Sequence, residues 1–94
     1  MRLGWAAEAL AELRDVQLYI AAENPAAARA TVAAIRRCAD RLRDHPELGR
    51  VSEEPPARVV TMPRSPYRIY YLVTADRILI LTVWHGARQW PPAG

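Results

Sequence analysis

The side chains most able to do chemistry lie in the stretch VWHGARQW, from Val83 to Trp90. A histidine titrates near neutral pH and can act as a general base or acid, and an arginine can neutralise a phosphate. Cleavage of RNA through its own 2′-hydroxyl needs a base, an acid and cations on the scissile phosphate. The residues that could supply this set without a metal are Tyr67, Tyr71, Arg64, Arg68, His85 and Arg88.

The same residues also have structural interpretations. His85 lies at the end of a strand-like run, where a histidine can be a hydrogen-bonded structural residue, and Tyr67 and Tyr71 share a strand face on which they would pack. Trp90 can fold back onto a sheet as an anchor. A sheet face with Trp84 or Trp90, rimmed by arginine, could instead bind a protein. The residues alone leave catalysis, docking and anchoring open.

Metal and cofactor chemistry is disfavoured. His45 and His85 are the two histidines and Cys38 is the single cysteine, and no pair of them has ligand spacing on one element. We find no glycine-rich phosphate loop or nucleotide fingerprint, and Ser52 and Ser65 lack the context of a serine nucleophile. We therefore predict no metal site and no cofactor.

Composition bounds the class of protein. The 94 residues predict one domain, 1–94, and a hydrophobic fraction of 51% argues against disorder. All thirteen basic residues are arginine, which suits contacts with carboxylates or phosphates, although a GC-rich genome produces the same bias. A net charge of +3 permits an acidic protein or a nucleic acid as partner. One cysteine, early acidic residues in place of a signal peptide, and no membrane-length apolar run together predict a cytoplasmic protein.

The first half of the chain reads as a helical hairpin. From Ala6 to about Glu23, apolar residues recur at helical spacing, and the acidic residues fall mainly on the opposite face. Asn24-Pro25 is a favoured N-cap followed by a favoured first helical residue, so a second helix should run from Pro25 to about Arg43. The break of two residues predicts an antiparallel pair. Asp44 to Pro56 should be a loop, with Leu48 turned into the core.

The second half changes to a period of two. We expect strands over 57–62, 67–73 and 77–85, and a further short strand over 2–5. The strand over 77–85 is apolar on both faces, with Ile78 and Ile80 on one and Leu79, Leu81 and Val83 on the other, so it should lie in mid-sheet. The predicted fold is α+β, an N-terminal antiparallel helix hairpin packed on one face of a small, mainly antiparallel β-sheet.

Four segments in order carry a family resemblance. They are YIAAENPAAA at the end of the first helix, DHPELGR after the second, SPYRIYYLV in one strand and ILILTVWHGARQWP at the end. With these segments, spread over nearly the whole chain, the sequence resembles the ParE branch of the RelE/ParE superfamily of type II toxin–antitoxin toxins. The resemblance implies the superfamily more specifically than it implies an activity within it.

The resemblance implies a partner and a target. A ParE-like toxin is expected to be neutralised by a cognate, ParD-like antitoxin encoded beside it, in a hetero-oligomeric complex. The antitoxin's C-terminal segment, disordered alone, would wrap the toxin and so cover the second sheet face. Characterised ParE-type toxins poison DNA gyrase, whereas the relative RelE cuts mRNA in the ribosome. Contact with nucleic acid is expected only through the complex or in the RelE-like alternative.

Two positions favour inhibition by binding over catalysis. The RelE pattern has two lysines on the strand before the SPYR-like turn, and aligned on Tyr67-Arg68 these positions are Val59 and Thr61. Neither side chain can neutralise a phosphate. The loss of such charge stabilisation typically lowers the rate of cleavage by orders of magnitude. The V-W-H sequence matches a V-L-H pattern common in ParE-like chains, although the arginine that often precedes that pattern is Thr82 here.

We therefore predict a toxin that inhibits DNA gyrase by binding, with a ribosome-dependent mRNA endonuclease as the alternative. An inactive relative that persists as a binding module is a third interpretation. The residues expected to contact the target are Arg64, Arg68, His85, Arg88 and Trp90. In the alternative, the catalytic residues would be Arg68, His85 and Arg88. The antitoxin is expected to contact the outer faces of the helix hairpin and the sheet edge, through Leu13, Tyr19, Arg58 and Arg77.

Overall fold

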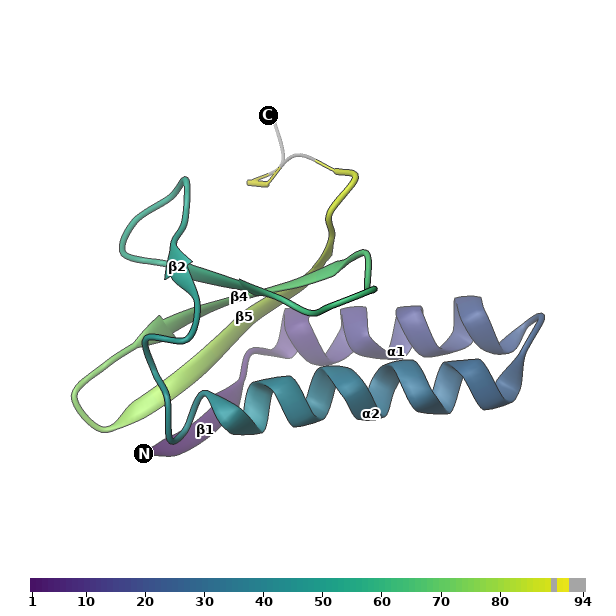
Figure 1. The fold of residues 1–94 in the computed structure, drawn as a ribbon, viewed down its shortest axis with the longest axis horizontal. Helices are drawn as coiled ribbons and strands as arrows, with labels where there is room; N and C mark the ends of the chain where they lie inside the picture. The colour runs from purple at the N-terminus through teal and green to yellow at the C-terminus, as the bar shows by residue number, and fades with distance from the viewer. Residues whose placement is uncertain (89, 92–94) are drawn as a thin grey trace.

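The helical hairpin begins the fold and lies along one side of the sheet. The computed structural model describes residues 1–88 and 90–91. Helix α1 spans Ala7–Ala21 and helix α2 spans Pro25–Arg41, side by side and antiparallel (Figure 1). Both helices end two residues before the sequence predicted. Neither described helix is long and apolar enough to cross a bilayer.

The start of α2 forms as the sequence predicted. The Asn24 side chain accepts a hydrogen bond from the backbone N–H of Ala27, 3.0 Å away, and Pro25 occupies the first helical position. This side chain satisfies a donor that the first helical turn leaves without an intrahelical partner. Because proline has no N–H and a φ near the helical value, it adds no further unsatisfied donor.

Five strands form one mixed sheet in the order β1-β5-β4-β3-β2. Their bounds are β1 Arg2–Trp5, β2 Arg50–Val51, β3 Arg58–Thr61, β4 Tyr67–Val73 and β5 Arg77–His85. Only β1 pairs in parallel, with β5, so the expected α+β fold with a mainly antiparallel sheet is confirmed. The bounds of β1, β4 and β5 match the prediction, β3 is one residue shorter at each end, and β2 was not predicted.

A β-bulge in β5 corrects one predicted face. Tyr70 pairs with Thr82 but the next residue, Tyr71, pairs with Ile80, so Leu81 is an extra residue in β5. An extra residue reverses the alternation of side chains beyond it. Val83 therefore lies with Ile78 and Ile80 in the helix-facing core, and the prediction that it shares a face with Leu79 is wrong.

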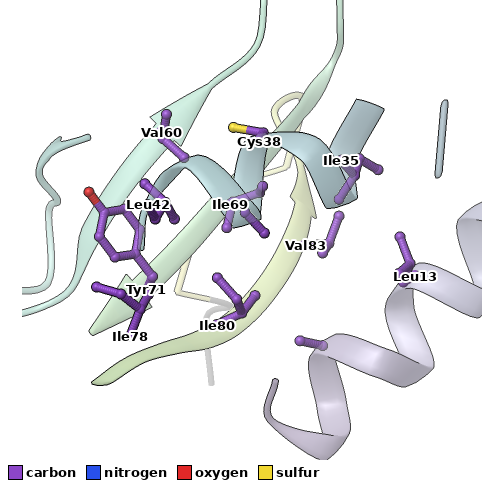
Figure 2. Close-up of a cluster of buried hydrophobic side chains, with 12 residues drawn as sticks. Leu13, Ile35, Cys38, Leu42, Val60, Ile69, Tyr71, Ile78, Ile80 and Val83 are labelled. Atoms are coloured by element: carbon purple, nitrogen blue, oxygen red, sulfur yellow. The ribbon is translucent and has the colours of Figure 1, made fainter. Parts of the chain in front are cut away.

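The core fills the space between the hairpin and this face of the sheet. Figure 2 shows Leu13 of α1 and Ile35 of α2 close to Val83, and Leu42, which follows α2 directly, close to Tyr71. These side chains are at most 4% exposed. Burying a side chain of this size contributes about 1.5–3 kcal/mol. The apolar faces of the two helices and the apolar face of the sheet bury each other here. This burial is the reason that the hairpin covers this face.

The opposite sheet face is covered in part by the chain itself. The loop after β2 and residues 90–91 lie on the side of the sheet away from the helices (Figure 1). There Tyr70 is fully buried, with its ring stacked on Trp90 at 3.9 Å between centroids, and its hydroxyl donates to Glu53 of the loop at 2.5 Å. Trp90 is thus an anchor for the end of the described chain.

The side chain of Tyr71 holds the loop between α2 and β3. The Tyr71 hydroxyl accepts a hydrogen bond from the Gly49 N–H (2.9 Å) and donates one to the Pro46 carbonyl (2.8 Å). These two bonds join the backbone on either side of Leu48 to one buried side chain, and Leu48 itself is 40% exposed. The prediction that Leu48 enters the core is therefore wrong.

Candidate functional site

A groove runs between α1 and the C-terminal end of β5. It has a volume of about 770 Å³, and its lining combines acidic, basic and aromatic side chains. The lining residues are Glu12, Asp15, Val16, Tyr19, Tyr67, Val83, Trp84, His85 and Arg88. This groove exists because β1 pairs with β5 only as far as Ile80, so that α1 lies beside the rest of the strand.

Glu12 joins the two walls of the groove. One of its carboxylate oxygens accepts a hydrogen bond from the Thr82 hydroxyl at 2.6 Å and another from the Val83 backbone N–H at 3.2 Å. The helical spacing predicted that the acidic residues of α1 fall mainly on the outer face, and this prediction is wrong for Glu12. The carboxylate satisfies an edge amide of β5 that no neighbouring strand reaches.

His85 is held in one orientation at the end of β5. Its Nδ1 accepts a hydrogen bond from the Ala87 backbone N–H at 3.1 Å. Its ring meets that of Tyr67 edge-on, at 5.5 Å between centroids and 82° between planes. Since Nδ1 acts as an acceptor, the neutral ring carries its proton on Nε2. His85 thus has both the structural role considered from sequence and a place in the lining of the groove.

Arg88 closes the same end of the groove. Its guanidinium lies 5.3 Å from the centre of the Trp84 ring, and its carbonyl accepts a hydrogen bond from the indole N–H of Trp84 at 3.1 Å. These two contacts fix the turn that follows β5. A guanidinium that lies over a half-buried aromatic ring keeps its donors free for a partner.

Arg68 projects from the other face of the sheet. In the register, Tyr67 pairs with His85 and Arg68 pairs with Trp84, and successive side chains of a strand alternate between faces. The Arg68 guanidinium lies against Gly86, where an added Cβ would be 3.1 Å from Nε. The positive charge of Arg68 acts on Tyr70 and Glu53, which belong to that face.

The pair of Tyr70 and Glu53 has shifted pKa values. Burial raises the pKa of the Tyr70 phenol, and the hydrogen bond to Glu53 raises it further, against a smaller opposing effect of Arg68. The hydrogen bond from Tyr70 lowers the pKa of the Glu53 carboxyl. Both shifts favour a neutral phenol that donates to an ionised carboxylate.

Arg64 lies apart from the groove. It follows β3 in a turn and has a φ of 61°, which an L-residue adopts infrequently. It lines a separate depression with Pro63, Ser65, Tyr67 and residues of both helices. The five expected target contacts therefore divide into three groups: His85 and Arg88 in the groove, Arg68 and Trp90 on the opposite face, and Arg64 in the turn.

The residues expected to bind the antitoxin are also dispersed. Tyr19 is 80% exposed on α1, and Arg77 is exposed beside Gly4 of β1. Arg58 is half-buried and donates from Nε to the Gly49 carbonyl at 2.9 Å. Leu13 is only 3% exposed because it lies on the α1 face that packs on the sheet, so this fold offers no Leu13 surface to a partner.

Sequence reasoning missed the acidic wall of the groove and the covering of Tyr70. Glu12 and Asp15 were predicted to face solvent. Nothing in the sequence links Glu53 with Tyr70. The helical spacing of Glu12, Asp15 and Tyr19 was the available signal, because residues three and four apart share a face. Across residues 1–88 and 90–91, no three metal-ligating side chains come together.

The comparisons with known proteins decide the family. The model of the ParE toxin of the type II toxin–antitoxin system, parDE, matches residues 3–90. The chain belongs to the ParE toxin family. The resemblance carried by the four sequence segments is thereby confirmed, and this ParE-family chain is a toxin of the type II toxin–antitoxin class.

Individual relatives agree with the family match. The ParE-family chain is 36% identical over 90 residues to the toxin candidate Y4kP of Sinorhizobium fredii, an alignment that covers 96% of this chain and 93% of that protein. It is 33% identical over 84 residues to the toxin RelE2 of Caulobacter vibrioides, covering 89% and 93%. A solved chromosomal ParDE toxin–antitoxin system from P. aeruginosa matches with a TM-score of 0.80 and 28% identity, covering 90% and 95%.

Proposed function

We propose that this toxin stops growth by binding DNA gyrase in the cytoplasm, and that a ParD-like antitoxin encoded beside it neutralises it. Membership of the ParE family and the likeness to a ParDE system support a toxin with an antitoxin partner. The choice of gyrase rests on the separation of Arg68 from His85 across the sheet. That separation disfavours a nuclease site and favours a protein that acts by binding.

A metal-free nuclease needs its base and its cations around one phosphate. His85 lines the groove beside α1, whereas Arg68 projects from the opposite face beside Tyr70. The positions at which RelE-like chains would carry lysines are Val59, which is 2% exposed, and Thr61. Among the described residues that line the groove, Arg88 is the one arginine beside His85, and one cation is a small part of the required charge.

The C-terminal turn offers features of a binding surface. Arg88 stacks on the half-buried ring of Trp84, and Trp90, also half-buried, continues the surface onto the opposite face. Tryptophan and arginine are enriched among the residues that dominate protein interfaces. Anchoring and docking are compatible here, because a stacked ring can present its outer face to a partner.

The test compares two activities of the purified toxin. Blocked supercoiling or trapped gyrase–DNA complexes, with intact mRNA on programmed ribosomes, would support the proposal. Arg88→Ala should weaken gyrase inhibition while Arg29→Ala, at an exposed arginine of α2, should leave it unchanged. Normal gyrase activity in the presence of the toxin would refute the proposal.

A second candidate is ribosome-dependent mRNA cleavage. The relative named toxin RelE2 and the presence of His85, Tyr67 and Arg88 in one groove favour it. Codon-positioned cuts that disappear in His85→Gln, with gyrase unaffected, would establish this function in place of gyrase binding. The antitoxin partner would remain the same in either case.

A further inference from the structure

The sheet ends in two edge strands that differ in how well they are protected. Strand β2, at one edge, has only two residues, and a loop with Pro55-Pro56 follows it. Strand β1, at the other edge, has four residues and pairs with β5 in a continuous register (Figure 1). Very short strands, prolines and bulges keep a sheet edge from pairing with another chain. Strand β1 has none of these features, so its free edge can accept a further strand.

The free edge of β1 presents the backbone groups of Leu3 and Trp5. The N–H of Arg2 donates to the Asp76 carbonyl at 3.2 Å, and the N–H of Ala6 also donates to β5, at 2.8 Å. Because successive residues of a strand direct their backbone groups to opposite edges, those of Leu3 and Trp5 point away from β5. Within the described residues no strand lies beyond β1 to pair with them.

The side chains at this edge are apolar and incompletely covered. Leu3 and Trp5 are half-buried and pack against the core between the sheet and the hairpin. The guanidinium of Arg36 lies 5.7 Å from the centre of the Trp5 ring, so α2 holds this ring in place without any partner. A strand added beside β1 would extend the core and cover the exposed parts of both side chains.

The strand β1 is complementary to a second copy of itself. In an antiparallel pair, the outward groups of one strand must meet the outward groups of the other. Both Leu3 and Trp5 are used in the register that places Leu3 opposite Trp5 of the second copy, with the two copies of Gly4 facing each other on the twofold axis. Twofold symmetry makes the Leu3–Trp5 contact twice. Cross-strand pairs of an aromatic and an aliphatic side chain stabilise antiparallel sheets.

The charges near β1 favour the same pairing. Arg2 is exposed at the start of the strand, and Glu8 is exposed in the first turn of α1, shortly after the strand ends. In the antiparallel register Arg2 lies opposite Ala6 of the second copy, two residues before Glu8 of that copy. The positive start of each strand thus approaches the negative residue beyond the end of the other. The ion pair of Arg2 with Asp76, at 3.0 Å, is exposed and engages one guanidinium nitrogen, so other donors remain.

We propose that two copies of this chain associate through β1 as antiparallel edge strands, which joins two five-stranded sheets into one. A second copy is the partner because the hydrogen-bonding register, the apolar pairs and the charges all match the strand itself. A foreign peptide would use the same backbone groups, and its binding is an outcome of the test. The inference does not depend on which target the toxin binds.

The first experiment tests the register with a disulfide. Gly4→Cys sets two cysteines opposite each other at about 4.5 Å between Cα atoms, which is within disulfide range. The new Cβ is tolerated in a single copy, since the atom nearest to it is the flexible end of Arg77 at 2.7 Å. Oxidation of the purified toxin should yield a covalent dimer of Gly4→Cys. The control Ala26→Cys, at an exposed position of α2, should stay monomeric, and the buried Cys38 is common to both variants.

The second experiment tests the charges by analytical ultracentrifugation. Arg2→Glu and Glu8→Arg each bring like charges together in a homodimer, so each should raise the dissociation constant of the dimer at least about tenfold. An equimolar mixture restores opposite charges at both ends of the interface, and the dimer should return with near wild-type affinity. The control Glu23→Arg, an exposed site with the same change of charge, should dimerise normally. Circular dichroism checks that every variant is folded.

Three results would overturn the proposal. They are a toxin that stays monomeric at its highest soluble concentration, a Gly4→Cys variant that crosslinks no faster than Ala26→Cys, and an equimolar mixture that restores no dimer. Hydrogen exchange identifies a foreign partner instead. Protection of 2–6 that rises with toxin concentration would support the dimer. Protection that appears only when another protein is added would assign this edge to that protein and refute the pairing of two copies.

Discussion

The carboxylate of Glu12 accepts a hydrogen bond from the hydroxyl of Thr82, 2.6 Å away across 70 residues of sequence. The same oxygen accepts a hydrogen bond from the backbone N–H of Val83, so one acidic side chain of α1 fixes the end of β5. Thr82 is 5% exposed, and removal of its acceptor leaves two donors without a partner.

Glu12→Ala should therefore destabilise the fold by about 1–3 kcal/mol, the cost of buried unsatisfied donors. Glu12→Gln keeps an acceptor oxygen and should cost less. Urea unfolding followed by circular dichroism measures both. Glu23→Ala, at an exposed position beyond α1, serves as the control and should have a small effect. An equal effect of Glu12→Ala and Glu23→Ala would mean that the Glu12 contacts contribute no net stability.

Tyr71→Phe should also destabilise the protein, by about 1–3 kcal/mol, because the Gly49 amide loses a buried acceptor. The matched change Tyr19→Phe, at a ring that is 80% exposed, should be nearly neutral. Denaturation midpoints compare the two variants. Faster hydrogen exchange at 46–50 in Tyr71→Phe alone would show that the loop depends on this hydroxyl, and unchanged exchange would contradict it.

Asn24→Ala should cost about 1 kcal/mol through loss of the N-cap of α2. Asn24→Asp keeps a capping oxygen and should stay close to wild type. Thermal unfolding of the two variants separates capping from a general effect of substitution. A midpoint for Asn24→Asp as low as that of Asn24→Ala would indicate that the cap geometry matters little here.

Trp90→Ala should remove the stacking on Tyr70, which is worth about 0.5–1.5 kcal/mol beyond the buried area. The Tyr70 ring then becomes exposed. Stability and gyrase inhibition are measured on the same preparation, with Arg88→Ala as the comparison. If both variants fold normally and remain fully toxic, the C-terminal turn is an anchor and contributes nothing to target binding.

The Glu53–Tyr70 pair predicts a dependence of stability on pH at both extremes. The lowered pKa of Glu53 means that its contribution is present above the ordinary carboxyl value of 4.5 and is lost as the pH falls through the folded-state pKa. The raised pKa of Tyr70 means that its contribution is present below the ordinary phenol value of 10.0 and is lost as the pH rises through the folded-state pKa. Glu53→Gln should remove the acid-side component, which unfolding curves at several pH values would detect. An unchanged pH profile would exclude this pair as its source.

Several elements could be predicted from the sequence because local chemistry decides them. Asn24-Pro25 separates the helices whatever packs on them, and the runs of β-branched, leucine and tyrosine residues over 67–73 and 77–85 specify strands. The order of four segments was enough to predict the family. Leu13 was predicted for the core by its helical spacing and for antitoxin contact by the resemblance, and its burial excludes the second role in this fold.

The pairings across the sheet are what only the tertiary structure decided. The bulge at Leu81 changes the face of Val83, and the alternation in the sequence gives no sign of it. Three hydrogen bonds join residues that lie far apart in the chain: Glu12 with Thr82, Glu53 with Tyr70, and Tyr71 with Pro46. Local spacing specifies which face of its own element a residue occupies, whereas its partner depends on how separate elements pack. The sequence therefore determined both helices, four of the five strands and the family, and packing determined that His85 and Arg68 lie on opposite faces.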